Sequence, residues 1–209
     1  MRLARISARQ HGVVGRRQLL ALGFDDDRIR RRVGRSLHRV HAGVFAVGHP
    51  RLTQHGRWMA AVIACGQGAW LSYLDAALLW DFYEGTGPRI HVTVKSHRRV
   101  QGLVLHRTRR IDPDEVATKD AIPVTTVART LVDLAEILSE DRLLRAMREA
   151  EFKRLLELDA LSAAVERAHG KPGLRALKRA IARHHPGQVI RGELEHRFAR
   201  LRQLSLIHI

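Results

Sequence analysis

The stretch that decides the fold is DDDRIRRRVGRSLHRVHAGVFAVG, residues 25–48. Asp25 is a good N-cap residue, and the two aspartates after it suit the positive end of a helix dipole. Ile29 and Val33 are four residues apart and share one helical face. LHRV and VFAV, which follow, are short strand-like runs joined by the turn His-Ala-Gly, and Gly43 supplies the positive φ that such a turn needs. The stretch therefore predicts a helix followed by a β-hairpin.

Two shorter helices are expected ahead of this stretch. LARISARQHG, residues 3–12, puts Leu3 and Ile6 on one side and ends in a glycine. In VVGRRQLLALG, residues 13–23, the two valines lead directly into a second helix that stops at the final glycine. Helix, helix, turn, helix and hairpin is the order of a winged helix-turn-helix, whose third helix enters the major groove of DNA. We therefore predict a winged helix-turn-helix DNA-binding domain over residues 1–50.

The charge of these fifty residues points to DNA. They hold eleven arginines and three aspartates, a net charge of +8 out of +16 for the whole chain. A sequence pI of about 11.5 favours a polyanionic partner. At 100° per residue, Arg28, Arg31 and Arg35 are expected opposite Ile29, with other arginines beside them. The expected DNA-binding residues are Arg16, Arg17, Gln18, Arg28, Arg31, Arg32, Arg35, His38 and Arg39.

Three considerations weigh against this interpretation. A genome rich in G and C favours arginine codons everywhere, which would make the basic charge incidental. The three aspartates begin the helix at the end that usually approaches bases, where they repel phosphate. Some winged helices bind only protein, and in that alternative the basic face contacts an acidic toxin.

The rest of the chain predicts a mixed α+β domain over residues 51–185. WMAAVIACG (58–66) and AWLSYLDAALLWDF (69–82) have the composition of packed helices. RIHVTVK (89–95) alternates as a half-buried strand, and both LVLHRT and a piece near DEVATKDAIPVTT are expected to pair with it. Thr125 or Thr126 caps a following helix, and more helices come after it. The predicted fold class is α+β: a winged helix-turn-helix, a mixed middle domain and C-terminal helices.

Composition restricts the location and the chemistry of the protein. Cys65 is the single cysteine, which excludes an internal disulfide and predicts a small buried hydrophobic residue. No run is long enough to span a membrane, and the first ten residues lack the apolar core of a signal peptide, so we expect a cytoplasmic protein with no membrane partner. There is no phosphate-binding loop of the form GxxxxGK[ST], no GxSxG motif and no set of metal ligands. We expect no cofactor, no metal and no catalytic residue.

Four segments carry a family resemblance. They are ARQHGVVGRRQLLALG (8–23), LHRVHAGVFAVG (37–48), LSYLDAALLWDF (71–82) and AIPVTTVARTLVDLA (121–135). In this order they resemble the AbiEi family, antitoxins of type IV toxin–antitoxin systems that also regulate transcription. The resemblance implies a winged helix that binds operator repeats, followed by a domain linked to toxin neutralisation, with a nucleotidyltransferase-like toxin as partner. One departure is Gly15, a poorer N-cap than the Thr or Ser that relatives often carry ahead of the second helix.

A second resemblance lies near the end of the chain. VIRGELEHRFARL (189–201) is similar to the first helix of a very-short-patch-repair-like endonuclease domain. Such nucleases hold a divalent metal with an Asp and an Asp/Glu-x-Lys pair, but no acidic residue follows Glu195 here. Glu193 and Glu195 lie about 200° apart around a helix and cannot converge on one ion. We therefore expect residues 186–203 to be the first helix of a truncated nuclease-like domain, without cleavage activity.

The last six residues, LSLIHI (204–209), can be encoded by a transposon end used in sequencing adapters. We expect them to be a sequencing artefact and leave them out of the fold prediction. The sequence as a whole predicts a DNA-binding transcriptional regulator and antitoxin rather than an enzyme. The alternative is a truncated fragment of a DNA endonuclease that uses the winged helix for targeting.

Overall fold

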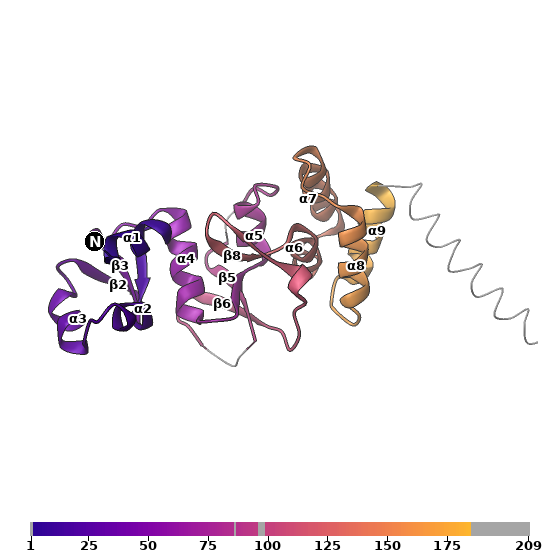
Figure 1. Ribbon diagram of the computed structural model, residues 1–209. Helices are drawn as coiled ribbons and strands as arrows, with labels where there is room; N and C mark the ends of the chain where they lie inside the picture. The colour runs from indigo at the N-terminus through magenta and orange to yellow at the C-terminus, as the bar shows by residue number, and fades with distance from the viewer. Residues whose placement is uncertain (1, 86, 96–98, 185–209) are drawn as a thin grey trace, which may run out of the picture. The chain divides into compact units, whose positions relative to one another are not determined.

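The computed structural model describes residues 2–85, 87–95 and 99–184 of the chain. These residues form a mixed α+β fold, as predicted at the level of the α+β class. The chain divides into two compact units, residues 1–130 and residues 131–209, and the boundary falls within one helix (Figure 1).

The first fifty residues build a three-stranded sheet and three helices. In chain order these elements are α1 (Arg2–Arg9), β1 (Val13–Gly15), α2 (Arg16–Ala21), α3 (Asp26–Arg32), β2 (Leu37–His41) and β3 (Val44–Val47). The strand order is β1-β3-β2 and both pairings are antiparallel. Val13 and Val14 were expected to lead directly into a helix, but they form strand β1 and pair with Ala46 and Phe45. The turn of the hairpin is also one residue shorter than expected, because His41 still pairs with Val44.

The two faces of this sheet are buried in different cores. Val14, Leu19, Ile29, Leu37 and Phe45 form one cluster beneath the three helices, with Leu3 and Ile6 partly buried against it. Because side chains alternate along a strand, the residues beside them point the other way. Val13 and Val44 accordingly join a second cluster, which contains helix α4 (Gln54–Cys65). This alternation is what attaches the N-terminal elements to the rest of the first unit.

A five-stranded mixed sheet lies on the other side of α4. Its strands are β4 (Ala69–Leu71), β5 (Ile90–Val94), β6 (Leu103–Arg107), β7 (Val116–Lys119) and β8 (Ile122–Thr125). Helix α5 (Tyr73–Leu79) follows β4 in the chain, and the short 3-10 helix η1 (Pro113–Glu115) precedes β7. The strand order is β6-β5-β4-β8-β7. The strand predicted within residues 89–95 and its pairing with LVLHRT are confirmed as β5 and β6. Cys65 is buried at the end of α4, as expected.

Two expectations for this sheet are wrong. Residues 69–71 were assigned to a helix, but they form β4, which pairs with β5 on one side and with β8 on the other. The segment near DEVATKDAIPVTT was expected to pair with β5; it folds instead into the β7–β8 hairpin, whose β8 pairs with β4. In both cases the pairing partner is distant in sequence, and the local pattern of apolar residues carries no information about it.

Helix α6 (Val127–Leu134) follows β8, and Thr126 caps it by accepting a hydrogen bond from the backbone N–H of Arg129 at 3.4 Å. The Arg129 guanidinium forms a buried ion pair with Glu115, 3.1 Å away. The second unit contains α7 (Glu140–Phe152), α8 (Leu158–Arg167) and α9 (Leu174–His184), which confirms the predicted C-terminal helices. Within it, Lys171 lies 2.8 Å from the buried carboxylate of Asp133. Among the helices of the described ranges, none is long and apolar enough to cross a membrane.

A buried carboxylate fixes the packing of the first unit. Asp75, on α5, accepts a hydrogen bond from the indole N–H of Trp58 on α4 at 2.8 Å. Its other oxygen accepts the backbone N–H of His91 on β5, also at 2.8 Å. One side chain therefore joins two helices to the sheet. Burial raises the pKa of Asp75 above its ordinary value, because the charged form loses its hydration.

The first prediction concerns Asp75. The raised pKa means that the native state binds this proton more tightly than the unfolded chain does, so the contribution of Asp75 to stability is largest when the group is protonated, near pH 4, and declines as pH rises through the native pKa. Asp75→Asn removes the titrating group, so its stability carries no pH dependence from this position, although its amide nitrogen cannot accept one of the two N–H groups. The free energy of unfolding of the wild type minus that of Asp75→Asn should therefore fall as the pH rises above the ordinary Asp pKa of about 4.

Urea unfolding followed by tryptophan fluorescence at several pH values measures this difference. Asp75→Ala serves as the second variant: it leaves two N–H donors without an acceptor and should cost about 2–4 kcal/mol. A wild-type minus Asp75→Asn difference that does not change with pH would contradict the raised pKa.

The second prediction concerns Gly15, the weak N-cap of α2. A Cβ atom at this position would lie 2.9 Å from Cγ2 of Ile63 on α4, so the space excludes the Ser or Thr that would cap better. Gly15→Ser should destabilise the protein by about 1–3 kcal/mol despite the added capping group. Thermal unfolding of Gly15→Ser in the wild-type and Ile63→Ala backgrounds isolates the contact, since removal of the Ile63 methyl group should abolish most of the loss. A higher melting temperature for Gly15→Ser alone would show that capping dominates.

Candidate nucleic-acid interface

Helix α3 carries more arginines than any other helix of the first unit, and its two ends are set by local chemistry. Asp25 caps it as predicted, since its carboxylate accepts the backbone N–H of Arg28 at 2.6 Å. Ile29 is buried in the small core. The helix ends at Arg32 because Val33 is extended and Gly34 has a φ of +85°. Arg35 was expected on the helix, but it lies in the turn after it.

The arginines of α3 point in three directions around the helix. Arg31 lies about 200° from Ile29 and is exposed, so it faces directly away from the core. Arg28 and Arg32 share one flank, where their guanidinium carbons lie 4.5 Å and 5.3 Å from the ring centroid of Phe24. These cation–π contacts hold the two side chains against the protein surface while leaving their N–H groups free to donate.

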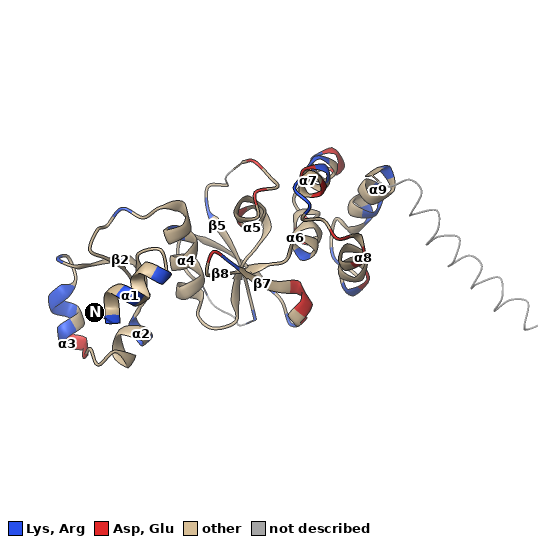
Figure 2. Cartoon of the chain, turned by 45° about the horizontal axis from the view of Figure 1, so that its top comes forward, with Lys and Arg blue, Asp and Glu red and all other residues tan. Residues whose placement is uncertain are grey.

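The three aspartates at the start of α3 are each matched by a local donor. Asp25 is the N-cap, and Asp27 lies 3.2 Å from the guanidinium of Arg30. Asp26 receives a bidentate interaction from Arg16 on α2, with Arg16 Nη2 at 2.6 Å and 2.7 Å from the two carboxylate oxygens. The acidic start of the helix is therefore balanced within the protein. In Figure 2 basic residues cover most of α3, and acidic residues are confined to its first turn.

A groove of about 410 Å³ lies between α3 and the β2–β3 hairpin. Ile29 and Phe45 line it, together with the basic side chains of Arg16, Arg30 and Arg39. Arg39 is exposed and lies opposite Phe45 in the strand register. The hairpin thus presents a cation on the same side as the flank of α3 that carries Arg30, which places the two elements in one basic surface.

His38 and Arg39 were both expected to lie along the DNA backbone, but they occupy opposite faces of β2. Alternation places His38 with Val40, which packs against the core around α4. The Nε2 atom of His38 is buried and has no hydrogen-bond partner within the described part of the chain. Burial also lowers the pKa of His41, which favours the neutral form of this histidine. Of the residues predicted on the hairpin, Arg39 is the one that the surface exposes.

Gln18 has a structural role that accounts for its position. Its side-chain oxygen accepts the backbone N–H of Gly15 at 2.9 Å, which completes the weak cap of α2. Its amide also exchanges hydrogen bonds with the amide of Gln10, at 2.8 Å and 3.2 Å. Arg17, beside it, is exposed. The predicted set on α2 therefore divides into a capping residue, a cation paired with Asp26, and an exposed cation.

The exposed arginines without an acidic partner form the remaining charge of this surface. Across residues 2–85, 87–95 and 99–184, no ion pair to Asp or Glu involves Arg17, Arg31, Arg35 or Arg39. They come from α2, α3, the turn after α3 and the hairpin. Phe24 is the member of this surface that sequence reasoning missed. Its signal is an aromatic residue placed four and eight positions before two arginines, which is too common to stand out.

A second group of polar side chains in the first unit contains two histidines and a tyrosine. His91 Nδ1 and His106 Nε2 lie 3.0 Å apart, and the ring of His106 stacks on Tyr73 with centroids 3.6 Å apart. Within the described ranges, however, no group of three or more His, Cys, Asp or Glu side chains could hold a metal ion. Glu193, Glu195 and the nuclease-like segment lie outside the described residues. The basic surface around α3 is the feature with the clearest chemical character.

The sequence matches no protein-family model, and no curated protein matches it.

Proposed function

We propose that the protein is a DNA-binding transcriptional regulator whose first fifty residues act as a winged helix-turn-helix. The order of elements supports the proposal: helix, strand, two helices, then a hairpin, with the strand order β1-β3-β2. In winged helices the helix before the hairpin reads the major groove. Here that element is α3, the most arginine-rich helix of the first unit.

The observation that carries the proposal is the combination of neutralised aspartates with outward arginines on one short helix. Asp26 and Asp27 are balanced by Arg16 and Arg30, so the start of α3 does not present uncompensated negative charge to phosphate. Arg31 faces away from the core at the centre of the exposed side. A bidentate guanidinium in this position matches the O6 and N7 atoms of guanine.

The remaining cations have the positions of backbone contacts. Arg17 is the second residue of α2, and Arg39 extends from the hairpin. Phosphate contacts from such flanking residues fix the register of a recognition helix and carry little sequence information. We therefore assign base reading to Arg31 and positioning on the DNA backbone to Arg17 and Arg39.

The family resemblance extends the proposal to an antitoxin that represses its own operon and counteracts a nucleotidyltransferase-like toxin. The test is functional: the gene that neighbours this one should encode a protein whose expression arrests growth, and co-expression of this chain should restore it. DNA binding is tested separately, so the two parts of the proposal can fail independently.

The third prediction concerns salt. If the surface around α3 makes about four to six phosphate contacts, the logarithm of the binding constant for duplex DNA should fall with the logarithm of salt concentration with a slope of roughly −4 to −5. Fluorescence anisotropy with a labelled duplex between about 50 and 200 mM salt measures this slope. A binding constant that stays constant over this range would exclude the electrostatic mode.

The fourth prediction separates reading from positioning. Arg31→Ala should cost about 1–3 kcal/mol on a preferred duplex and much less on a scrambled one, because it removes a base contact. Arg39→Ala should weaken both duplexes about equally and reduce the salt slope by about one. Arg107→Ala, which removes an exposed cation from the edge strand β6, is the matched control and should change neither. Equal losses on both duplexes from Arg31→Ala would reduce α3 to a backbone contact.

A further inference from the structure

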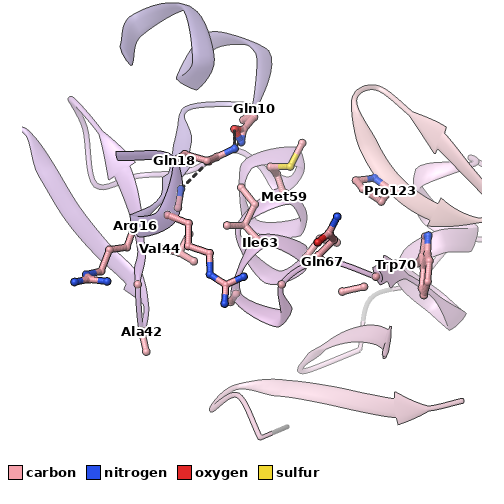
Figure 3. A pocket seen from close by; sticks show the side chains of 18 of the residues that line it. Gln10, Arg16, Gln18, Ala42, Val44, Met59, Ile63, Gln67, Trp70 and Pro123 are labelled. Atoms are coloured by element: carbon pink, nitrogen blue, oxygen red, sulfur yellow. Dashed lines mark hydrogen bonds between the residues drawn. The ribbon is translucent and has the colours of Figure 1, made fainter. Parts of the chain in front are cut away.

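The first unit contains a second hollow, which is larger than the groove beside α3 and adjoins it at Arg16, Ala42 and Gly43. Its volume is about 900 Å³, within the range that takes small organic ligands. The residues around it come from the start of α2, the turn of the β2–β3 hairpin, the end of α4, strand β4 and the β7–β8 hairpin. In Figure 3, Met59 and Ile63 line one side of this space, and Trp70 and Pro123 lie on the other.

The walls of this cavity are mainly apolar. Met59, Val62 and Ile63 contribute one wall from α4, and Trp70 contributes an aromatic surface from β4. Four glycines also line the cavity: Gly15, Gly43, Gly66 and Gly68. Larger side chains at these positions would fill part of the volume. A cavity of this composition favours a ligand with an apolar or aromatic body.

The charged lining of the cavity is entirely positive. Arg16 and Arg17 line it, and no Asp or Glu does. Arg16 is occupied by its bidentate pair with Asp26, and Figure 3 shows it pointing away from Ile63 and Trp70. Gln10 and Gln18, the polar pair at the edge, hydrogen-bond to each other (Figure 3). Arg17 is therefore the lining cation whose charge no acid balances within the described residues.

We propose that this cavity binds a small organic anion that has an apolar body, such as an aromatic carboxylate or sulfonate, with Arg17 pairing to the anionic group. The apolar walls supply burial for the body, and a guanidinium at the rim supplies a charge-assisted hydrogen bond to the acid. Charge complementarity selects an anion over a neutral or cationic ligand of the same shape. The proposal concerns ligand binding alone and does not depend on DNA binding.

Two fluorescent probes test the proposal on the full chain without DNA. The first is 8-anilinonaphthalene-1-sulfonate, which has the proposed chemistry, and the second is N-phenyl-1-naphthylamine, which has the same aromatic body without the sulfonate. The wild type should bind the sulfonate at one saturable site and the neutral probe at least tenfold more weakly. Arg17→Gln should weaken the sulfonate about tenfold and leave the neutral probe unchanged. Arg17→Lys should recover most of the sulfonate affinity.

Two further variants complete the design. Arg107→Gln removes an exposed cation of β6 that does not line the cavity, and it should bind both probes like the wild type. Ala64→Phe fills the cavity from α4 and should weaken both probes at least tenfold, with near-ultraviolet circular dichroism confirming that the variant is folded. The proposal is overturned if Arg17→Gln binds the sulfonate like Arg107→Gln does, if folded Ala64→Phe keeps the wild-type affinities, or if the sulfonate binds without saturating.

Discussion

The burial of helix α4 on nearly all sides is the constraint on which the first unit depends. One side of the helix contacts Val13 and Val44 of the small sheet, and the other contacts the strands of the five-stranded sheet. Residues 58–65 of α4 are all apolar, so this part of the helix has to be enclosed, and two sheets enclose it. Its Trp58 side chain adds a direct polar tie to Asp75, so that the position of the helix along its axis is fixed as well as its depth.

The basic surface depends on a second balance, between charges of opposite sign on neighbouring elements. The Arg16–Asp26 pair joins the start of α2 to the start of α3, and it does so on a surface where isolated ion pairs contribute little to stability. Its effect is to leave Arg31 as the dominant outward charge of α3. The cation–π contacts of Phe24 act similarly on the flank, where they restrict two long side chains that would otherwise be mobile.

Features with a local cause could be predicted from the sequence, and features that depend on distant partners could not. The cap at Asp25, the positive φ at Gly43 and the strand around Val92 follow from short-range rules, and all three are confirmed. Strands β1 and β4 have only three residues each, and their pairing partners lie more than twenty residues away. The candidate surface follows the same division: the sequence indicated Arg31, while the buried face of His38 depends on how β2 packs.

The shortness of α3 has a consequence for how much information the proposed surface could extract from DNA. Seven helical residues extend about 10 Å, the length of roughly three base pairs along the duplex axis. A DNA sequence of about three base pairs occurs very many times among the roughly 10⁶–10⁹ sites of a genome. If α3 reads the bases, a unique operator therefore has to combine several such three-base-pair sites. Two or more copies of the chain would then bind them at a fixed spacing along the DNA helix.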